Sequence, residues 1–142
     1  MHDGTSADEG IAKGSGAWEG PLDTAIMFVD LVDSSVFASV LGLKEYADYV
    51  ESFHEVVRVQ CDHFFEHCLK GKYEKGTDYE YYVMGDQLVF FMHTEKPSND
   101  VYLLTTLGIT LKAAWVASPF NRERVERRSA AAEIAIGINF GT

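Results

Sequence analysis

The sequence predicts an α+β domain in which helices pack on an antiparallel sheet. Four short apolar segments have the length and composition of strands, at residues 24–31, 79–84, 87–92 and 133–140. A longer segment, residues 43–69, repeats apolar side chains every three or four positions, as an amphipathic helix does. The chain has 142 residues, 46% of them hydrophobic and 13% aromatic, which suffices for one packed core.

The first elements follow from composition and turn chemistry. Residues 1–21 are rich in Gly, Ser, Ala and acidic groups, which predicts a flexible arm before a domain at 22–142. Residues 24–31 are nearly all apolar and therefore predict a central strand. The Asp-Ser-Ser run at 33–35 predicts an N-cap for a short helix at 34–41, whose first N–H groups could bind an anion. Gly42 breaks that helix.

The long helix is expected to place Cys61 and Cys68 on one face, since they lie seven residues apart. After it, two strands joined tightly at Gly85 and Asp86 predict a β-hairpin.

The last third of the chain predicts one more helix and one more strand. Residues 97–99 start a helix at 100–116, which Pro119 closes off, and Leu111 and Trp115 belong to the core. Residues 122–128 predict a solvated turn or a short helix. The order strand, helix, helix, strand, strand, helix, strand is that of the ferredoxin-like split βαβ plan. The sequence stops directly after a strand of buried type, so we expect the natural protein to continue beyond it.

The charge excludes several function classes. A formal net charge of −10 and a pI near 4.8 argue against nucleic-acid binding and against an anionic membrane surface. No apolar run is long enough to span a bilayer and no signal peptide is visible. With two cysteines and no CxxC pair, a cytoplasmic location is expected.

Two aspartates carry the functional prediction. Asp30 ends the first apolar run, and Asp86 lies between the second and third. A carboxylate at such a position must be hydrated, paired or bound to a cation, because burying it alone is costly. If the two meet in space, their oxygens suit magnesium or manganese. The alternative is a pair of turn aspartates with no ligand.

Three motifs resemble those of class III nucleotidyl cyclases. Residues 28–35, FVDLVDSS, resemble the first metal motif, F-x-D-[IL]-x-x-[SF]-[ST]. Residues 84–91, MGDQLVFF, resemble the second, a Gly-Asp in a hairpin, and residues 136–141, IGINFG, resemble the strand I-G-[IV]-[HN]-x-G. The resemblance covers residues 22–142 and implies a nucleoside triphosphate substrate that cyclises with release of pyrophosphate.

The resemblance also implies roles for single residues. Asp30 and Asp86 would bridge two divalent ions, Mn²⁺ or Mg²⁺, and the carbonyl of Leu31 would be a further ligand. The N–H groups of residues Asp33, Ser34 and Ser35 would hold the triphosphate. The asparagine and arginine that the family places after the third motif are absent, so a chain that ended at Thr142 should turn over little.

Tyr82 stands where purine cyclases carry the residue that reads the base. Together with Asn139, it makes the chain resemble the pyrimidine cyclases of bacterial Pycsar antiphage defence, whose cyclic UMP or cyclic CMP activates an effector. UTP is favoured over CTP. The alternatives are a sheet-packing aromatic at Tyr82, an ATP or GTP cyclase with an unusual base reader, and a non-catalytic regulatory domain. The family further implies a homodimer in which Tyr82 faces the partner's site.

The histidines are weaker candidates for a metal site. His63 and His67 have a spacing that can chelate zinc, but histidines on a helix surface are the more ordinary explanation. The sequence pattern assigns no role to His54 and His93.

Overall fold

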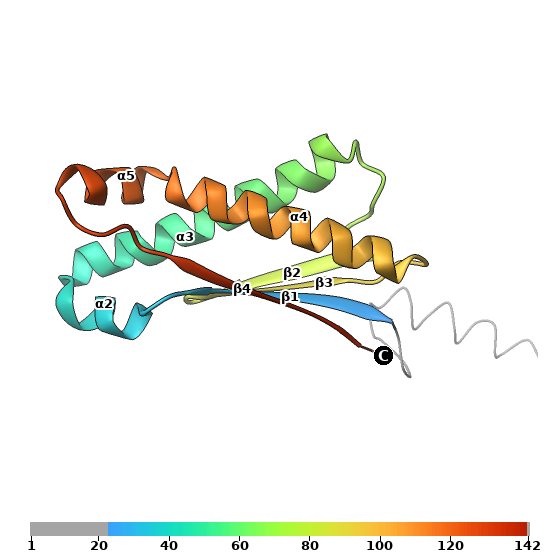
Figure 1. The fold of residues 1–142 in the computed structure, drawn as a ribbon, viewed down its shortest axis with the longest axis horizontal. Helices are drawn as coiled ribbons and strands as arrows, with labels where there is room; N and C mark the ends of the chain where they lie inside the picture. Colours follow the sequence, from blue (N-terminus) through green and yellow to red (C-terminus); the bar gives the residue numbers. More distant parts are fainter. Residues whose placement is uncertain (1–22, 142) are drawn as a thin grey trace, which may run out of the picture.

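A computed structural model describes residues 23–141, which form a four-stranded antiparallel sheet with helices packed on it (Figure 1). The elements are β1 (Thr24–Leu31), α2 (Ser34–Val40), α3 (Leu43–His63), η1 (Phe64–Cys68), β2 (Tyr79–Met84), β3 (Gln87–Met92), α4 (Pro97–Val116), α5 (Pro119–Glu126) and β4 (Ile134–Gly141). The strand order is β2-β3-β1-β4, with every neighbouring pair antiparallel. The predicted fold class is confirmed. The predicted arm, residues 1–21, lies outside the described residues.

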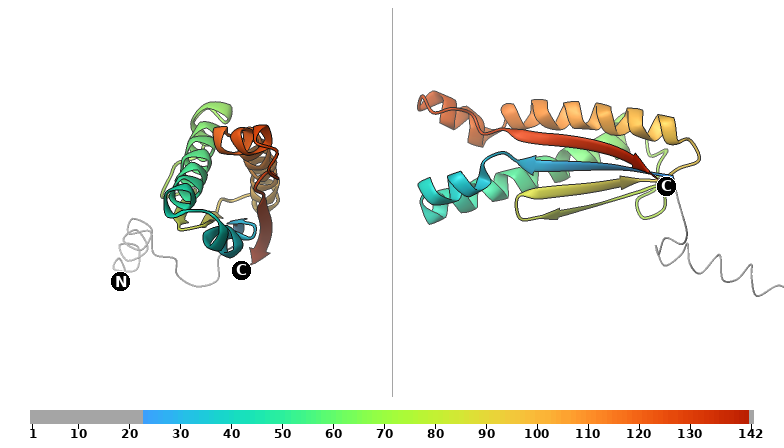
Figure 2. Two further views of the ribbon diagram at one scale, coloured as in Figure 1. Left: turned by 90° about the vertical axis from the view of Figure 1, so that its left-hand side faces the viewer. Right: turned by 60° about the horizontal axis from the view of Figure 1, so that its bottom comes forward.

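Helices α3, α4 and α5 all lie on one side of the sheet (Figures 1 and 2). Side chains alternate across a strand, so every second residue of β1 and β3 points toward these helices. The core between the two layers is apolar and closely packed. Its largest fully buried side chains are Trp115, Tyr49, Phe53, Phe65, Phe90, Met27, Leu88, Met92, Leu104, Leu107, Leu111 and Val29. The core positions predicted for Leu111 and Trp115 are confirmed.

The long helix changes its winding near its end, which corrects one prediction. The segment η1 is π-helical, and the N–H of Leu69 bonds to the carbonyl of Phe64 at 3.0 Å, five residues back. A wider turn rotates the following side chains away from the stripe that α3 sets up. Cys61 is therefore fully buried whereas Cys68 is exposed, and the two cysteines do not share a face.

A second difference lies after α4. Pro119 does not merely follow a helix, because it is the first residue of α5. The hydroxyl of Ser118 accepts the N–H of Asn121 and caps this helix. Proline suits the first helical position, where its missing N–H costs nothing. The short helix foreseen at 122–128 thus begins earlier, at Pro119.

The last strand, β4, lies at the edge of the sheet beside β1, and only Ile134 in it is buried. The buried type expected of this strand is therefore wrong. α4 passes closely over β4 at Gly108, where an added Cβ would lie 3.3 Å from Cγ2 of Ile136.

Candidate functional site

The two aspartates predicted to act together lie at the same end of two neighbouring central strands. β1 and β3 are antiparallel, and their register pairs Asp30 with Gln87. Asp86 is the residue before Gln87, in the turn of the β2–β3 hairpin. The N–H of Leu31 donates to the carbonyl of Asp86 at 3.0 Å, which ties the turn to the end of β1.

The carboxylates of Asp30 and Asp86 interact electrostatically. Partial burial raises the pKa of Asp30, and the negative charge of Asp86 raises it further. Within residues 23–141, the salt bridges of lysine and arginine involve other carboxylates. In the part of the chain that the structure describes, two like charges therefore come together and no lysine or arginine forms a salt bridge with either.

The hairpin turn has the geometry that its sequence demands. Gly85 is the first of the two turn residues and has φ 56°, in the left-handed region that glycine adopts without strain. Its carbonyl accepts a hydrogen bond from Nε2 of His54 on α3, at 2.6 Å. Sequence reasoning missed this contact, because the two residues lie 31 positions apart and only the packing of α3 brings them together.

The turn between β1 and α2 differs from its prediction. Asp33 occupies the N-cap position in the left-handed region, with φ 59°, and its side chain makes no capping bond. The hydroxyl of Ser34 instead donates to the carboxylate of Asp86. The first hydrogen bond of the helix runs from the N–H of Phe37 to the carbonyl of Asp33, at 3.0 Å. The N–H groups of Ser34 and Ser35 precede that bond and have no partner within the helix.

The other two predicted site residues are placed differently. Leu31 has a buried side chain, so only its backbone is available near the aspartates. Tyr82 is 54% exposed on the sheet face opposite the helices. The register from Tyr82 through Val89 to Phe28 puts it on the same face as Asp30, but on β2, two strands away from β1. Along the hairpin, Tyr82 lies four residues before Asp86.

The donor set decides which kind of metal would fit. Among the described residues no group of three or more Asp, Glu, His or Cys side chains gathers to hold an ion. Two carboxylates are too few to form a closed structural metal site, which usually has four protein ligands. They do suit Mg²⁺ or Mn²⁺, which proteins commonly bind through one or two carboxylates together with the phosphates of a substrate. Asp30 and Asp86 fit ions of that kind.

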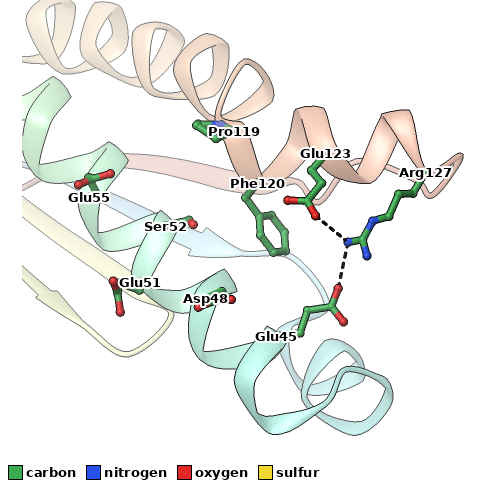
Figure 3. Close-up of a pocket in the computed structure, with 9 residues that line it drawn as sticks. All are labelled: Glu45, Asp48, Glu51, Ser52, Glu55, Pro119, Phe120, Glu123 and Arg127. Carbon is green, nitrogen blue, oxygen red and sulfur yellow. Dashed lines mark hydrogen bonds and ion pairs between the residues drawn. The ribbon is translucent and has the colours of Figure 1, made fainter.

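A cavity elsewhere on the surface is also acidic, but it excludes these two aspartates. It has a volume of about 390 Å³ and lies between α3 and α5 (Figure 3). Its lining residues are Glu45, Asp48, Glu51, Ser52, Glu55, Pro119, Phe120, Glu123 and Arg127.

The histidine pair with zinc-chelating spacing lies on the surface. His63 and His67 lie with ring centroids 5.1 Å apart, and both are exposed.

Comparison with known proteins identifies the fold of the chain. No protein-family model and no curated protein sequence matches the chain. Solved structures do match. The guanylyl cyclase Cya2 gives a TM-score of 0.61 at 16% identity, over 86% of this chain and 55% of that one.

Two further structures agree with it. The active GGEEF domain of a diguanylate cyclase from Vibrio cholerae gives a TM-score of 0.55 at 10% identity, over 94% of this chain and 69% of that one. A bacterial light-regulated adenylyl cyclase gives 0.54 at 12% identity, over 87% and 55%. The chain thus shares the fold of these cyclase structures. It spans about half the length of the guanylyl and adenylyl cyclase chains.

The described helices were also compared with the requirements of a membrane span. Within residues 23–141 no single helix is long and apolar enough to cross a bilayer. Only α4 and α5 taken together, bent by 45° between them, pass on length and composition.

Proposed function

We propose that this chain forms part of the catalytic domain of a nucleotide cyclase. The reaction converts a nucleoside triphosphate to its 3′,5′-cyclic monophosphate and pyrophosphate. The observation that carries this proposal is the approach of Asp30, at the end of β1, to Asp86 in the hairpin turn, with no salt bridge to either among residues 23–141. The fold supports it, because the three similar solved structures described above are cyclases.

Each residue of the candidate site has a defined task in this reaction. Asp30, Asp86 and the carbonyl of Leu31 would hold two divalent ions. Such ions, when bound, make a hydroxyl more acidic and neutralise charge on a leaving group. The N–H groups at Asp33, Ser34 and Ser35 would bind the triphosphate, and the Ser34 hydroxyl restrains the Asp86 carboxylate.

The bond changes are those of an in-line displacement. The 3′-oxygen of the ribose forms a bond to the α-phosphorus, and the bond from that phosphorus to the bridging oxygen breaks. Pyrophosphate leaves with that oxygen, and the hydroxyl proton passes to solvent. The protein contributes mainly by fixing the distance and alignment of the reacting atoms.

For the base we propose uracil, and hence cyclic UMP as an antiphage signal that activates a separate effector. Tyr82 supports a pyrimidine, because its ring is large and its single hydroxyl both donates and accepts. It is 54% exposed and makes one edge contact with Phe91, at 6.4 Å between ring centroids, so its hydroxyl is accessible to a ligand. A bulky side chain there leaves less room for a purine.

A purine substrate is the second candidate. The similar structures include a guanylyl and an adenylyl cyclase, which favours GTP or ATP. The two candidates share the metal-binding aspartates and differ only at the base, so Tyr82 discriminates between them.

A homodimer would complete the site. The sheet face that carries Asp30 also carries apolar side chains that the helices do not cover, including Phe28 and Met84, 42% and 63% exposed. A second copy on this face would cover them and bring its Tyr82 toward Asp30 and Asp86 of the first. A two-fold pair is the common arrangement for such self-complementary surfaces.

The test is a product assay on the full-length protein. Each of the four ribonucleoside triphosphates is incubated with Mn²⁺, and cyclic products are identified by mass spectrometry. Cyclic UMP that disappears in Asp30→Ala supports the proposal. Product from ATP or GTP alone would replace the pyrimidine assignment, and no product from any triphosphate would favour a non-catalytic domain. Tyr82→Lys with unchanged base selectivity would remove Tyr82 from the base pocket.

A further inference from the structure

The turn that carries Asp86 is held from outside the sheet by a side chain of α3. Nε2 of His54 lies 2.6 Å from the carbonyl oxygen of Gly85. A carbonyl oxygen can only accept, so Nε2 carries the hydrogen in this contact. Gly85 is exposed and the turn has only two residues, so its position depends on a small number of bonds.

Three hydrogen bonds from three elements meet at this turn. His54 holds the carbonyl of Gly85, and the N–H of Leu31 holds the carbonyl of Asp86 at 3.0 Å. The hydroxyl of Ser34 holds the carboxylate of Asp86 itself. Of the three donors, His54 is the one that belongs neither to the sheet nor to the β1–α2 segment.

The part of α3 that carries His54 is well anchored. Its neighbour Phe53 is fully buried, as is Tyr49, and Val57 is nearly so. The Tyr49 hydroxyl reaches the carbonyl of Val32 at 3.5 Å, in the β1–α2 turn. α3 therefore contacts both turns that carry the candidate site, His54 on one side and Tyr49 on the other.

We infer that His54 is a positioning residue, which fixes the Gly85 carbonyl so that the Asp86 carboxylate stays directed toward the Asp30 side of the site. This inference rests on the proposed function, because it gives His54 a task in holding divalent ions. Groups that orient metal ligands commonly change metal affinity 10- to 100-fold when they are removed. A structural role alone would change only the stability of the fold.

Two substitutions that differ in reach separate these roles. Glutamine carries its amide nitrogen as many bonds from Cα as histidine carries Nε2, so His54→Gln keeps a donor near Gly85. Asparagine is one bond shorter, so His54→Asn loses the contact while remaining polar. His67→Asn is the matched control, since His67 is an exposed histidine at the far end of the same helical segment.

The first measurement is amide hydrogen exchange by NMR on the full-length, metal-free protein. The Leu31 amide reports on the turn, because it donates to the carbonyl of Asp86. In His54→Asn we expect this amide to exchange about three- to tenfold faster, the effect of losing one hydrogen bond. In His54→Gln and His67→Asn its rate should stay within about twofold of the parent. Unchanged exchange in His54→Asn would overturn the inference.

The second measurement is the affinity for Mn²⁺ alone, from the electron paramagnetic resonance of free Mn²⁺. We expect about tenfold weaker binding in His54→Asn, and binding close to that of the parent in His54→Gln. Equal loss in both variants would show that the ring merely packs, and would overturn the inference. If the parent forms no cyclic product from any triphosphate, the proposed function fails instead, and the exchange rates still decide whether His54 holds the turn.

Discussion

Two polar clusters of this protein differ in how far their polar groups have partners among the described residues. Around Asn121, which is fully buried, every polar group has a partner inside the chain. Its amide nitrogen donates to the carbonyls of Trp115 and Ala132 at 2.8 and 3.1 Å, and its oxygen accepts the N–H of Ala132 at 2.7 Å. Around Asp30 and Asp86, two carboxylates approach each other and no basic side chain of the described residues pairs with them.

Under the proposed function, the difference separates a structural cluster from a functional one. The Asn121 cluster joins α4, α5 and the segment before β4, so its hydrogen bonds stabilise the fold. Burial and the charge of Asp86 raise the pKa of Asp30 in the free protein, and a bound cation would offset both effects. Substitutions should therefore affect folding at one cluster and ligand binding at the other.

The largest effect is expected from neutralising either aspartate. Asp86→Asn or Asp30→Asn should lower cyclase turnover by on the order of 10³-fold, because the charge that holds the ions is lost. The thermal midpoint should not fall. Turnover by mass spectrometry and unfolding by differential scanning fluorimetry measure the two effects. Asp48→Asn, at an exposed pair with Lys44, is the control and should leave turnover intact.

The Asn121 cluster should behave in the opposite way. Asn121→Ala leaves the buried N–H of Ala132 without its partner and removes the amide's hydrogen bonds to the carbonyls of Trp115 and Ala132. The expected loss is about 2–4 kcal/mol of unfolding free energy, measured by urea denaturation. Mn²⁺ affinity of the folded fraction should be unchanged. A variant as stable as the parent would show that the cluster is not what joins α4 and α5 to β4.

Gly85 is relevant both to stability and to the candidate site, because its backbone conformation shapes the turn that carries Asp86. Gly85→Ala places a Cβ at φ 56°, which should cost about 1–2 kcal/mol although nothing lies within 4 Å of it. Gly42→Ala is the matched control, since it is equally open but has an ordinary negative φ. Urea denaturation of both variants measures the difference. Equal stability of the two would argue against a backbone requirement in the hairpin.

The smallest effect is the pH dependence that Asp30 gives to stability. Its pKa is raised in the folded protein, so the folded state binds the proton more tightly than the unfolded chain does. The resulting stabilisation is present at low pH and is lost as pH rises through the raised pKa. Asp30→Asn should therefore match the parent at acidic pH and exceed its thermal midpoint at pH 7, by on the order of 1 °C for so exposed a group. Saturating Mn²⁺ should reverse that order.

Much of the fold could be predicted because local signals agreed with tertiary structure. The apolar runs predicted the bounds of three strands correctly: β1 (Thr24–Leu31), β2 (Tyr79–Met84) and β3 (Gln87–Met92). The π-helical turn and the separation of Cys61 from Cys68 could not be predicted, since hydrophobic spacing assumes a constant helical period. The edge position of β4 depends on strand order, which composition does not encode.

The candidate site, like the fold, could be predicted from the sequence only in part. The sequence indicated Asp30 at a strand end and Asp86 in a hairpin, and the resemblance to the cyclases implied that the two approach each other. The contact from His54 to Gly85 and the bond from Ser34 to Asp86 depend on how helices dock, so the sequence offered no signal for them. Asp33 had the residue type of a cap, yet its left-handed backbone turns the chain without a side-chain bond.

Mapping where Mn²⁺ binds tests most directly whether Asp30 and Asp86 share a cation. In NMR spectra of the full-length protein, substoichiometric Mn²⁺ should first broaden the amide signals of Leu31, Ser34 and Asp86, and Asp30→Asn should abolish that broadening. Persistence of these signals at Mn²⁺ concentrations that already broaden Glu51 and Glu55 of the acidic cavity would contradict a shared cation site.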